Sequence, residues 1–266
     1  MTSVAVVGHV EWVQFLRVAR FPVPGEIQRA QRESTRAGGG AVVAAATLAE
    51  LGAEVDFYGA VGTDEIADAA VSELAHRGMT VHAARRPGPT REVLTLLDDR
   101  GERTILPIGE RLQPEGEDDL DWDRLAGADA AYLTAGDQGA LRRARAASVL
   151  VATPRLRERV DDPGVQIDAL VYSVTDENEV QWAERLAPHT RLMVATEGAH
   201  GGRWWGESEG RWMAVPPPGP VRDSYGCGDA FAAGFTYGLA AGTSVAEACA
   251  LGARWGAEML TRVGAP

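Results

Sequence analysis

The sequence predicts an α/β fold of three layers, in which helices cover both faces of a mainly parallel central sheet. Short apolar runs alternate with helical segments, most regularly where a helix at residues 138–147 separates strands at 130–133 and 149–152. The 266 residues contain neither a Pro/Ser-rich linker nor a block of like charge. We therefore expect one main domain with a sizeable core.

Composition excludes several functional classes. The chain has 26 basic and 38 acidic residues and a net charge of -12, so neither nucleic acid nor an anionic membrane surface is expected as a partner. All 26 basic residues are arginine, which excludes a P-loop lysine, a Schiff-base lysine and the lysine of protein kinases. Backbone N–H groups and arginine remain as the groups that could hold a phosphate.

Cysteine usage and the N-terminus favour a cytoplasmic enzyme with reduced thiols. Two cysteines, Cys227 and Cys249, can form neither a disulfide framework nor a zinc cluster, and the five histidines are scattered. The first residues lack a basic segment followed by an apolar core, and no apolar run reaches about 18 residues, so neither secretion nor membrane spanning is supported.

The first predicted strand, residues 4–7, is a continuous apolar run that ends at Gly8. Substrate pockets of parallel sheets lie at the carboxyl ends of the strands, so Glu11 is a candidate substrate contact. Residues 15–20 and 27–36 then alternate apolar and polar side chains around FPVPGE, which predicts two exposed strands joined by a turn.

Three glycines, Gly38, Gly39 and Gly40, lead into an Ala-rich amphipathic helix that ends at Gly52. Glycines before a helix can admit a ligand hydroxyl to the backbone N–H groups, or they can serve only a tight turn. The residues alone leave both interpretations open.

The middle of the chain continues the alternation of helices and strands. A short helix is predicted at residues 119–125 and a strand at 169–172, which runs into a helix start with Ser or Thr as cap, SVTDENEV. The next strand, residues 192–195, ends at the turn TEGAHG. Three tryptophans follow in a predicted hairpin and are expected to serve packing: Trp204, Trp205 and Trp212.

Asp229 lies in the first turn of a predicted helix. Phe231, Phe235 and Leu239 fall on one face of this helix, and Gly242 ends it. The first backbone N–H groups of a helix have no internal partner and carry positive partial charge. A loop of small residues at this position can therefore close around a phosphate-like anion. A final helix is predicted at residues 245–261.

An aspartate at this position is ionised at neutral pH and could take the proton of a hydroxyl in the same pocket. This combination suits phosphoryl transfer to an alcohol. The alternative is that Asp229 is only a helix N-terminal acid, which is a common use of aspartate.

The segment DSYGCGDAFAAGF, residues 223–235, resembles the DTxGAGDxFxxGF signature of the ribokinase-like (PfkB) carbohydrate kinases. Ser224 and Cys227 depart from it, in place of Thr and Ala. The resemblance implies that Asp229 is the catalytic base and that Gly226, Cys227 and Gly228 form an anion hole. Cys227 fits as a small substitute, with a redox switch as the alternative.

The first signature of the family, GGxxANxAxxLxxLG, resembles the segment around the three glycines and implies that they bind substrate: Gly38, Gly39 and Gly40. LLDDRGERTIL resembles the VDxxGERT hairpin of the family, with its turn at Arg100 and Gly101. The resemblance implies a small β-sheet that acts as a lid over the sugar and often as the interface of a homodimer. The implied lid comprises residues 12–36 and 80–106, with strands at 80–84, 91–98 and 103–106, and the main domain comprises 1–11, 37–79 and 107–266.

The nucleotide half of the site is implied by two turns. Thr196, Gly198 and Gly201 match a T-x-G-x-x-G turn that lies beside the ATP phosphates and adenosine in the family. Ser173 and Asp176 have the spacing of the N-x-x-E motif that organises water around the nucleotide magnesium. Asp176 is therefore a candidate metal residue.

Asp223 is a second candidate, because in the family the first Asp of the signature takes part in a loop that binds a monovalent cation such as K+. Val13 and Val43 stand where the family has a sugar-binding Asp and Asn, and Glu11 could supply the missing carboxylate. We expect a pocket more apolar than one for ribose.

The resemblance implies an ATP- and Mg2+-dependent kinase for a hydroxyl of a small carbohydrate-like substrate, with a nucleoside as the alternative acceptor. The departures at Val13, Val43 and Ser173 motivate a second alternative, a nucleotide-binding sensor or scaffold that has lost activity. A phosphorylated acceptor ranks below a neutral one, because it would need an arginine in the lid: Arg17, Arg20, Arg29 or Arg103.

Overall fold

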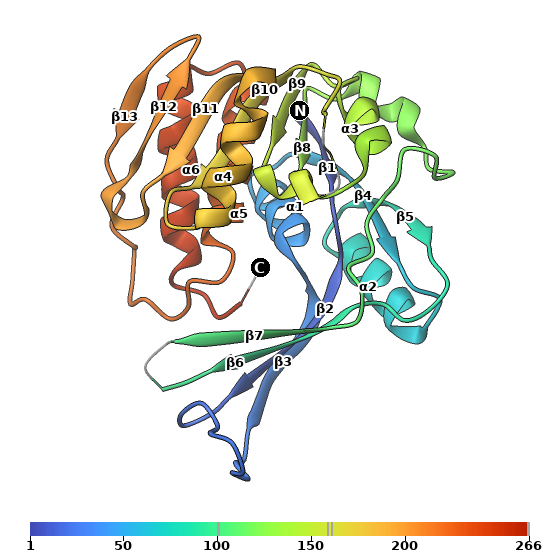
Figure 1. The fold of residues 1–266 in the computed structure, drawn as a ribbon, viewed down its shortest axis with the longest axis vertical. Coiled ribbons are helices and arrows are strands. Elements are labelled where there is room, and N and C mark those ends of the chain that lie inside the picture. The colour runs from blue at the N-terminus through green and yellow to red at the C-terminus, as the bar shows by residue number, and fades with distance from the viewer. Residues whose placement is uncertain (100–101, 159, 161, 265–266) are drawn as a thin grey trace.

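The structure, a computed structural model, describes residues 1–99, 102–158, 160 and 162–264 and contains two sheets (Figure 1). The turn predicted at Arg100 and Gly101 lies outside the described residues, as do the last two residues of the chain. The strands of the large sheet are β1 (Ser3–Val7), β4 (Glu54–Val61), β5 (Thr80–Arg85), β8 (Ala130–Leu133), β9 (Val149–Ala152), β10 (Ile167–Ser173), β11 (Thr190–Thr196), β12 (Gly202–Gly206) and β13 (Gly210–Trp212).

The strands of the large sheet lie in the order β13-β12-β11-β10-β9-β8-β1-β4-β5. All neighbours from β11 to β5 pair in parallel, and β12 and β13 add an antiparallel hairpin at one edge. The prediction of a mainly parallel sheet is confirmed.

Six α-helices and four short 3-10 helices connect the described strands. Their N-termini use the caps that the sequence offers: Asp64 and Ser244 each accept a backbone N–H of the helix that follows. The helices are α1 (Gly40–Glu50), α2 (Glu65–His76), α3 (Gln138–Ala144), α4 (Glu177–Leu186), α5 (Cys227–Ala240) and α6 (Val245–Met259), with η1 (Trp122–Gly127), η2 (Pro154–Glu158), η3 (Ala187–His189) and η4 (Gly198–His200).

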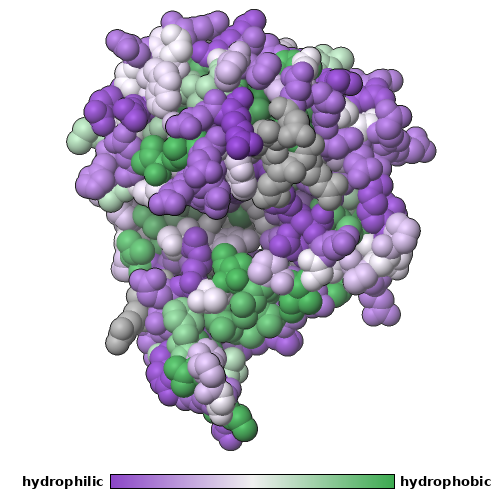
Figure 2. Space-filling view, in the orientation of Figure 1, coloured by the Kyte–Doolittle hydropathy of each residue, from purple (hydrophilic) through white to green (hydrophobic). Residues whose placement is uncertain are grey.

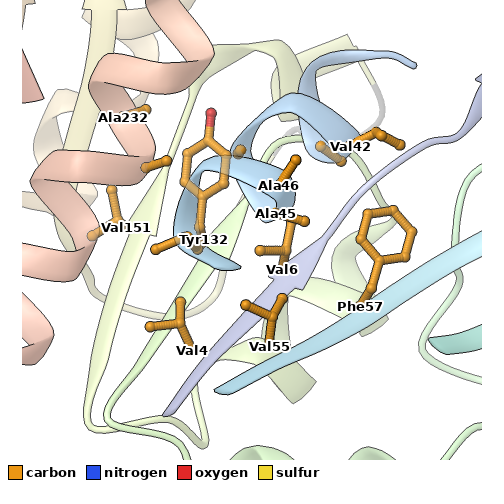
Figure 3. Close-up of a cluster of buried hydrophobic side chains, with 14 of the residues drawn as sticks. Val4, Val6, Val42, Ala45, Ala46, Val55, Phe57, Tyr132, Val151 and Ala232 are labelled. Atoms are coloured by element: carbon orange, nitrogen blue, oxygen red, sulfur yellow. The ribbon is translucent and has the colours of Figure 1, made fainter. Parts of the chain in front are cut away.

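The large sheet separates two cores, because both faces of its parallel strands are covered by helices. Val4 and Val6 of β1 pack into the core that α1, α2, α5 and α6 cover, part of which Figure 3 shows. Ala5 and Val7 pack into the opposite core, which α3 and α4 cover. The protein therefore has the three-layer α/β/α architecture that the sequence predicts.

The small sheet projects from one end of the large one (Figure 1) and consists of β2 (Glu11–Arg17), β3 (Gln31–Gly38), β6 (Glu92–Leu97) and β7 (Arg103–Ile108), in the order β3-β2-β6-β7. The prediction that residues 80–84 belong to it is wrong, because β5 pairs in parallel with β4 in the large sheet. As an edge strand, β5 is only partly buried. Its sequence therefore mixes apolar and polar residues, as the sequence of an exposed strand in the small sheet does.

Other elements differ from their predicted bounds by a few residues. The first strand of the small sheet begins at Glu11, shortly after the chain leaves β1, and the segment predicted as a helix at 119–125 is the 3-10 helix η1. The predicted tryptophan hairpin and its packing role are confirmed, since Trp212 stacks between Trp204 and Phe231 with ring centroids 6.3 and 5.1 Å away. In the described chain, no helix is both long enough and apolar enough to cross a lipid bilayer.

Candidate active site

The candidate site lies where the carboxyl ends of the central strands meet the N-terminus of α5. Thr196 ends β11, Ser173 ends β10, and both face a cavity beside the first turn of α5. The residues that line this cavity are Tyr132, Thr153, Arg155, Val171, Tyr172, Ser173, Glu179, Thr196, Gly228, Asp229 and Ala232.

The N-terminus of α5 is built as an open turn of backbone. Gly226 precedes the helix at a φ of 75°, which favours glycine, and a Cβ there would lie 2.8 Å from a methyl group of Val43. A Cβ on Gly228 would meet no other atom within 4 Å, so the space beside this residue is open to a ligand. The first N–H groups of a helix lack internal partners, so this turn fits a phosphate group.

Asp229 lies in the first turn of α5, as predicted, and its side chain is largely buried. Its Oδ1 accepts a hydrogen bond from Arg155 Nη1 at 3.2 Å. Arg155 Nε in turn donates to Oε1 of Glu179 at 2.8 Å, and Glu179 Oε2 accepts the N–H of Ser173 at 2.9 Å. One arginine thus joins two buried carboxylates.

The negative charge of Asp229 raises the pKa of the Arg155 guanidinium well above its ordinary value. Burial acts in the opposite direction, and the charge of Glu179 adds to the increase. Arg155 is therefore a permanent cation in the lining of the cavity. Sequence reasoning missed Arg155 and Glu179. The available signal was that Arg155 lies three residues after the predicted strand 149–152, near the carboxyl edge of the sheet.

The predicted substrate glycines lie against Asp229. A Cβ on Gly40 would be 2.6 Å from Asp229 Oδ1 and 3.2 Å from Arg155 Nη1. The backbone of residue 40 can therefore lie this close to the Asp229 carboxylate only because the residue is glycine. The N–H of Gly39 donates to the buried hydroxyl of Tyr225 at 3.0 Å, and Gly38 packs on Val13. The glycine turn therefore serves close packing as well as the substrate role that remains predicted for it.

Glu11 also lies beside these glycines. Its Oε1 is 3.3 Å from Arg91 Nη1 and 3.7 Å from His9 Nε2, and burial raises the pKa of its carboxyl group. His9, which the sequence places with Glu11 just after the first strand, would contact a Cβ on Gly39 at 3.2 Å. The first-strand turn and the glycine turn thus form one surface.

His9 makes the stability of the protein sensitive to acid. Burial, assisted by the charges of Arg111, Arg155 and Arg91, lowers the pKa of His9 to about 3. The unfolded chain, with a pKa near 6.5, then binds more protons between these two values, so stability falls as the pH drops below about 6.5. We expect His9 to account for a loss of about 2 kcal/mol in unfolding free energy between pH 7.5 and pH 5.

Urea unfolding of wild type and His9→Gln at both pH values checks this expectation. In His9→Gln, the unfolding free energy should fall by about 2 kcal/mol less between pH 7.5 and pH 5 than in wild type. In His200→Gln, which changes an exposed histidine, it should fall as much as in wild type. An equal acid loss in wild type and His9→Gln would contradict the assignment.

Val13 and Val43 are fully buried, and they pack in a third apolar cluster with Tyr225 and Ala230 below the α5 loop. Two valines that stand at polar positions of the family pattern therefore support the loop from beneath.

The predicted nucleotide turn is present at the end of β11. Thr196 lines the cavity and donates its hydroxyl to the carbonyl of Tyr172 at 3.3 Å. Gly198 and Gly201 both have positive φ, 58° and 86°, which explains why glycine stands at these positions. Their contact with nucleotide remains a prediction.

The two candidate metal residues are both engaged by hydrogen-bond donors. Asp176 caps α4 by accepting the N–H groups of Asn178 and Glu179 at 3.0 and 3.2 Å. Asp223 is buried and accepts the N–H groups of Tyr225 and Gly264 at 3.0 and 3.1 Å.

Arg103 Nη1 lies 3.4 Å from the same carboxylate, so Asp223 already has donors of the chain as partners, and its part in a K+ site stays a prediction. Across the described residues, no three His, Cys, Asp or Glu side chains form a metal site. Asp176 is not among the residues that line the cavity, so its part in binding Mg2+ stays a prediction.

Cys227 has the properties of a small packing residue. Burial raises the pKa of its thiol to about 12, so at pH 8 only about one thiol in 10⁴ is ionised. We expect a disulfide-exchange reagent to modify Cys227 at least about 100-fold more slowly in the native protein than in urea. Rapid modification of the native protein, located to Cys227 by mass spectrometry, would instead support the redox interpretation.

A family model described as pfkB family carbohydrate kinase matches residues 1–154 and 164–266. The ATP-dependent ribose-1-phosphate kinase of Halopiger xanaduensis is 35% identical over 138 residues, 50% of this chain and 46% of that protein. The acarbose 7(IV)-phosphotransferase of Actinoplanes sp. is 49% identical over 74 residues, 27% of this chain and 25% of that protein. The chain thus matches less than half the length of either relative.

Solved structures share the fold. Ribokinase from Thermotoga maritima superposes with a TM-score of 0.83 at 21% identity, covering 100% of this chain and 95% of that one. Ribokinase from Arabidopsis thaliana, complexed with ribose and ATP, superposes with a TM-score of 0.77 at 21% identity, with the same coverage.

Proposed function

The chain belongs to the pfkB family of carbohydrate kinases, and on this basis we propose that it transfers the γ-phosphoryl group of ATP to a hydroxyl of a small carbohydrate-like acceptor. The observation that carries the proposal is the position of Asp229. Its carboxylate lies at the open N-terminal turn of α5 and against Gly40 of the predicted substrate turn. A candidate base thus lies between the turn that would bind the phosphate and the turn that would bind the acceptor.

The chemistry of this site follows from its own residues. Asp229 takes the proton of the acceptor hydroxyl, whose oxygen forms a bond to the γ-phosphorus while the bond to the β-phosphate oxygen breaks and ADP leaves with that electron pair. The N–H groups at Gly226, Cys227 and Gly228 stabilise the charge on the transferring group. Mg2+ bound with ATP supplies further neutralisation of the phosphates.

The lid arginines favour a neutral acceptor over a phosphorylated one. Arg17 and Arg20 are paired with glutamates of the lid itself, and Arg103 donates to Ser224 Oγ at 2.6 Å. Arg91, beside the predicted acceptor residues, is paired with Glu11. These four arginines therefore already have partners within the chain. The named relatives include a kinase for a phosphorylated sugar and one for acarbose. An activity test must therefore include both phosphorylated and neutral sugars as acceptors.

The edge of the small sheet supports the proposal of a homodimer through the lid. β7 is the outer strand of this sheet, and three of its apolar side chains are 41 to 50% exposed, namely Ile105, Leu106 and Ile108. Figure 2 shows hydrophobic residues gathered over this part of the molecule. An exposed apolar edge strand is a surface on which a second copy can pair.

ATP consumption across neutral sugars, nucleosides and sugar phosphates tests the proposed function. We expect one class of acceptor to raise ATP consumption well above the rate without acceptor, and the same compound to raise the melting temperature by binding the native state. Binding of ATP with no acceptor-dependent turnover across the panel would contradict the kinase and support the nucleotide sensor.

A further inference from the structure

Arg155 connects the two halves of the candidate site. Its Nη1 lies 3.2 Å from Asp229 Oδ1 and 3.2 Å from the position of a Cβ on Gly40, which is the acceptor side. It also lines the cavity that Thr196, Ser173 and Gly228 border, which is the nucleotide side. A phosphoryl group that passes from ATP to an acceptor must cross this junction.

The contacts of Arg155 leave donors for a ligand. A guanidinium carries five N–H donors. Among the described residues, Arg155 uses Nε toward Glu179 and Nη1 toward Asp229, and no bond is formed by Nη2. Its side chain is 34% exposed, whereas those of Asp229 and Glu179 are 13% and 7% exposed. The arginine is therefore the accessible member of the three.

A purely structural role explains this arrangement poorly. Burying two carboxylates beside one guanidinium costs free energy that their attraction often fails to recover. Glu179 alone would suffice to neutralise Arg155. A cation held beside the base and the anion-binding turn is instead suited to a group whose negative charge is spread over three oxygens, as in phosphoryl transfer.

We propose that Arg155 is a catalytic residue that binds the transferring phosphoryl group, and that Glu179 is the residue that positions it. This inference rests on the proposed kinase function. The chain has no lysine, so any cationic side chain that binds the phosphate must be an arginine. Arg155 makes this contact through its remaining N–H donors. It keeps its proton throughout, while Asp229 takes the proton of the acceptor.

Binding of a transition-state mimic separates this role from simple nucleotide binding. Isothermal titration of ADP with Mg2+, and of ADP with Mg2+ and aluminium fluoride, is compared between wild type and Arg155→Ala. We expect Arg155→Ala to weaken binding of the fluoride complex about 10²–10³-fold while leaving binding of ADP nearly unchanged. Equal binding of the fluoride complex by both proteins, or an equal loss for both ligands, would overturn the proposal.

The matched control is Arg145→Ala, which removes an arginine–carboxylate pair, Arg145 with Asp168, outside the site. It should bind both ligands as wild type does. If wild type itself binds neither ligand and consumes no ATP with any acceptor, the kinase function fails, which is distinct from failure of the Arg155 role in an active kinase.

Turnover gives a second test once an acceptor supports activity. Arg155→Ala should lower kcat about 10³-fold, and low millimolar guanidinium chloride should restore part of that loss without affecting wild type. Glu179→Gln should lower kcat with little change in the KM for ATP. A fall in melting temperature with unchanged kcat in both variants would show a structural role only and overturn the proposal.

Discussion

Asp229→Asn is expected to lower kcat by about 10²–10⁴-fold, because the amide cannot accept the proton of the acceptor hydroxyl. The substitution keeps the size of the side chain and an oxygen that can accept the hydrogen bond from Arg155. Nucleotide binding should therefore change little. Steady-state kinetics with the best acceptor, together with titration of ATP analogues, measure both quantities.

The matched control for this experiment is Asp137→Asn. Asp137 also lies at a helix N-terminus, where it caps α3 by accepting the N–H of Ala140 at 2.7 Å, but it is not among the residues that line the cavity. If Asp229 were only a helix N-terminal acid, the two variants would behave alike, with small changes in stability and unchanged kcat. That outcome would refute the assignment of Asp229 as the base.

Gly40→Ala should reduce kcat by about 100-fold or more. The added Cβ would lie 2.6 Å from Asp229 Oδ1, so the carboxylate must move away from its position. A displacement of about 1 Å at a catalytic group can cost two orders of magnitude in rate. Because the same Oδ1 accepts the hydrogen bond from Arg155, the displacement should also lower the melting temperature.

Thermal unfolding and steady-state kinetics of Gly40→Ala, compared with Gly127→Ala, check this prediction. A Cβ on Gly127 meets no atom within 4 Å, so that variant should keep both stability and turnover. Wild-type kcat in Gly40→Ala would mean that the position of the Asp229 carboxylate does not matter for the reaction.

The local parts of the site could be predicted from the sequence. Helical periodicity and glycine placement locate Asp229 in the first turn of α5 because both act within a few residues, and the same holds for the turns at Gly40 and Thr196. The alternation of apolar strands and helices is likewise enough to predict the three layers. These features depend on contacts between near neighbours in the chain.

The contacts between distant segments could not be predicted. Arg155 is 74 residues from Asp229, and their meeting depends on the order of strands in the large sheet, which no local pattern sets. The wrong assignment of β5 has the same cause. A partly buried edge strand has a similar sequence pattern whether it belongs to the large sheet or to the small one, so the pattern does not identify its sheet. The sequence predicts a pocket with fewer polar contacts from Val13 and Val43, but only the structure reveals that both are buried in the cluster beneath the α5 loop.

The most direct measurement of the central claim is a crystal structure of the protein with a non-hydrolysable ATP analogue, Mg2+ and the acceptor that supports turnover. The account predicts the γ-phosphoryl group over the N–H groups that open α5, with the reacting hydroxyl within about 3 Å of an Asp229 carboxylate oxygen. An acceptor hydroxyl out of reach of Asp229, with the phosphates bound away from α5, would contradict it.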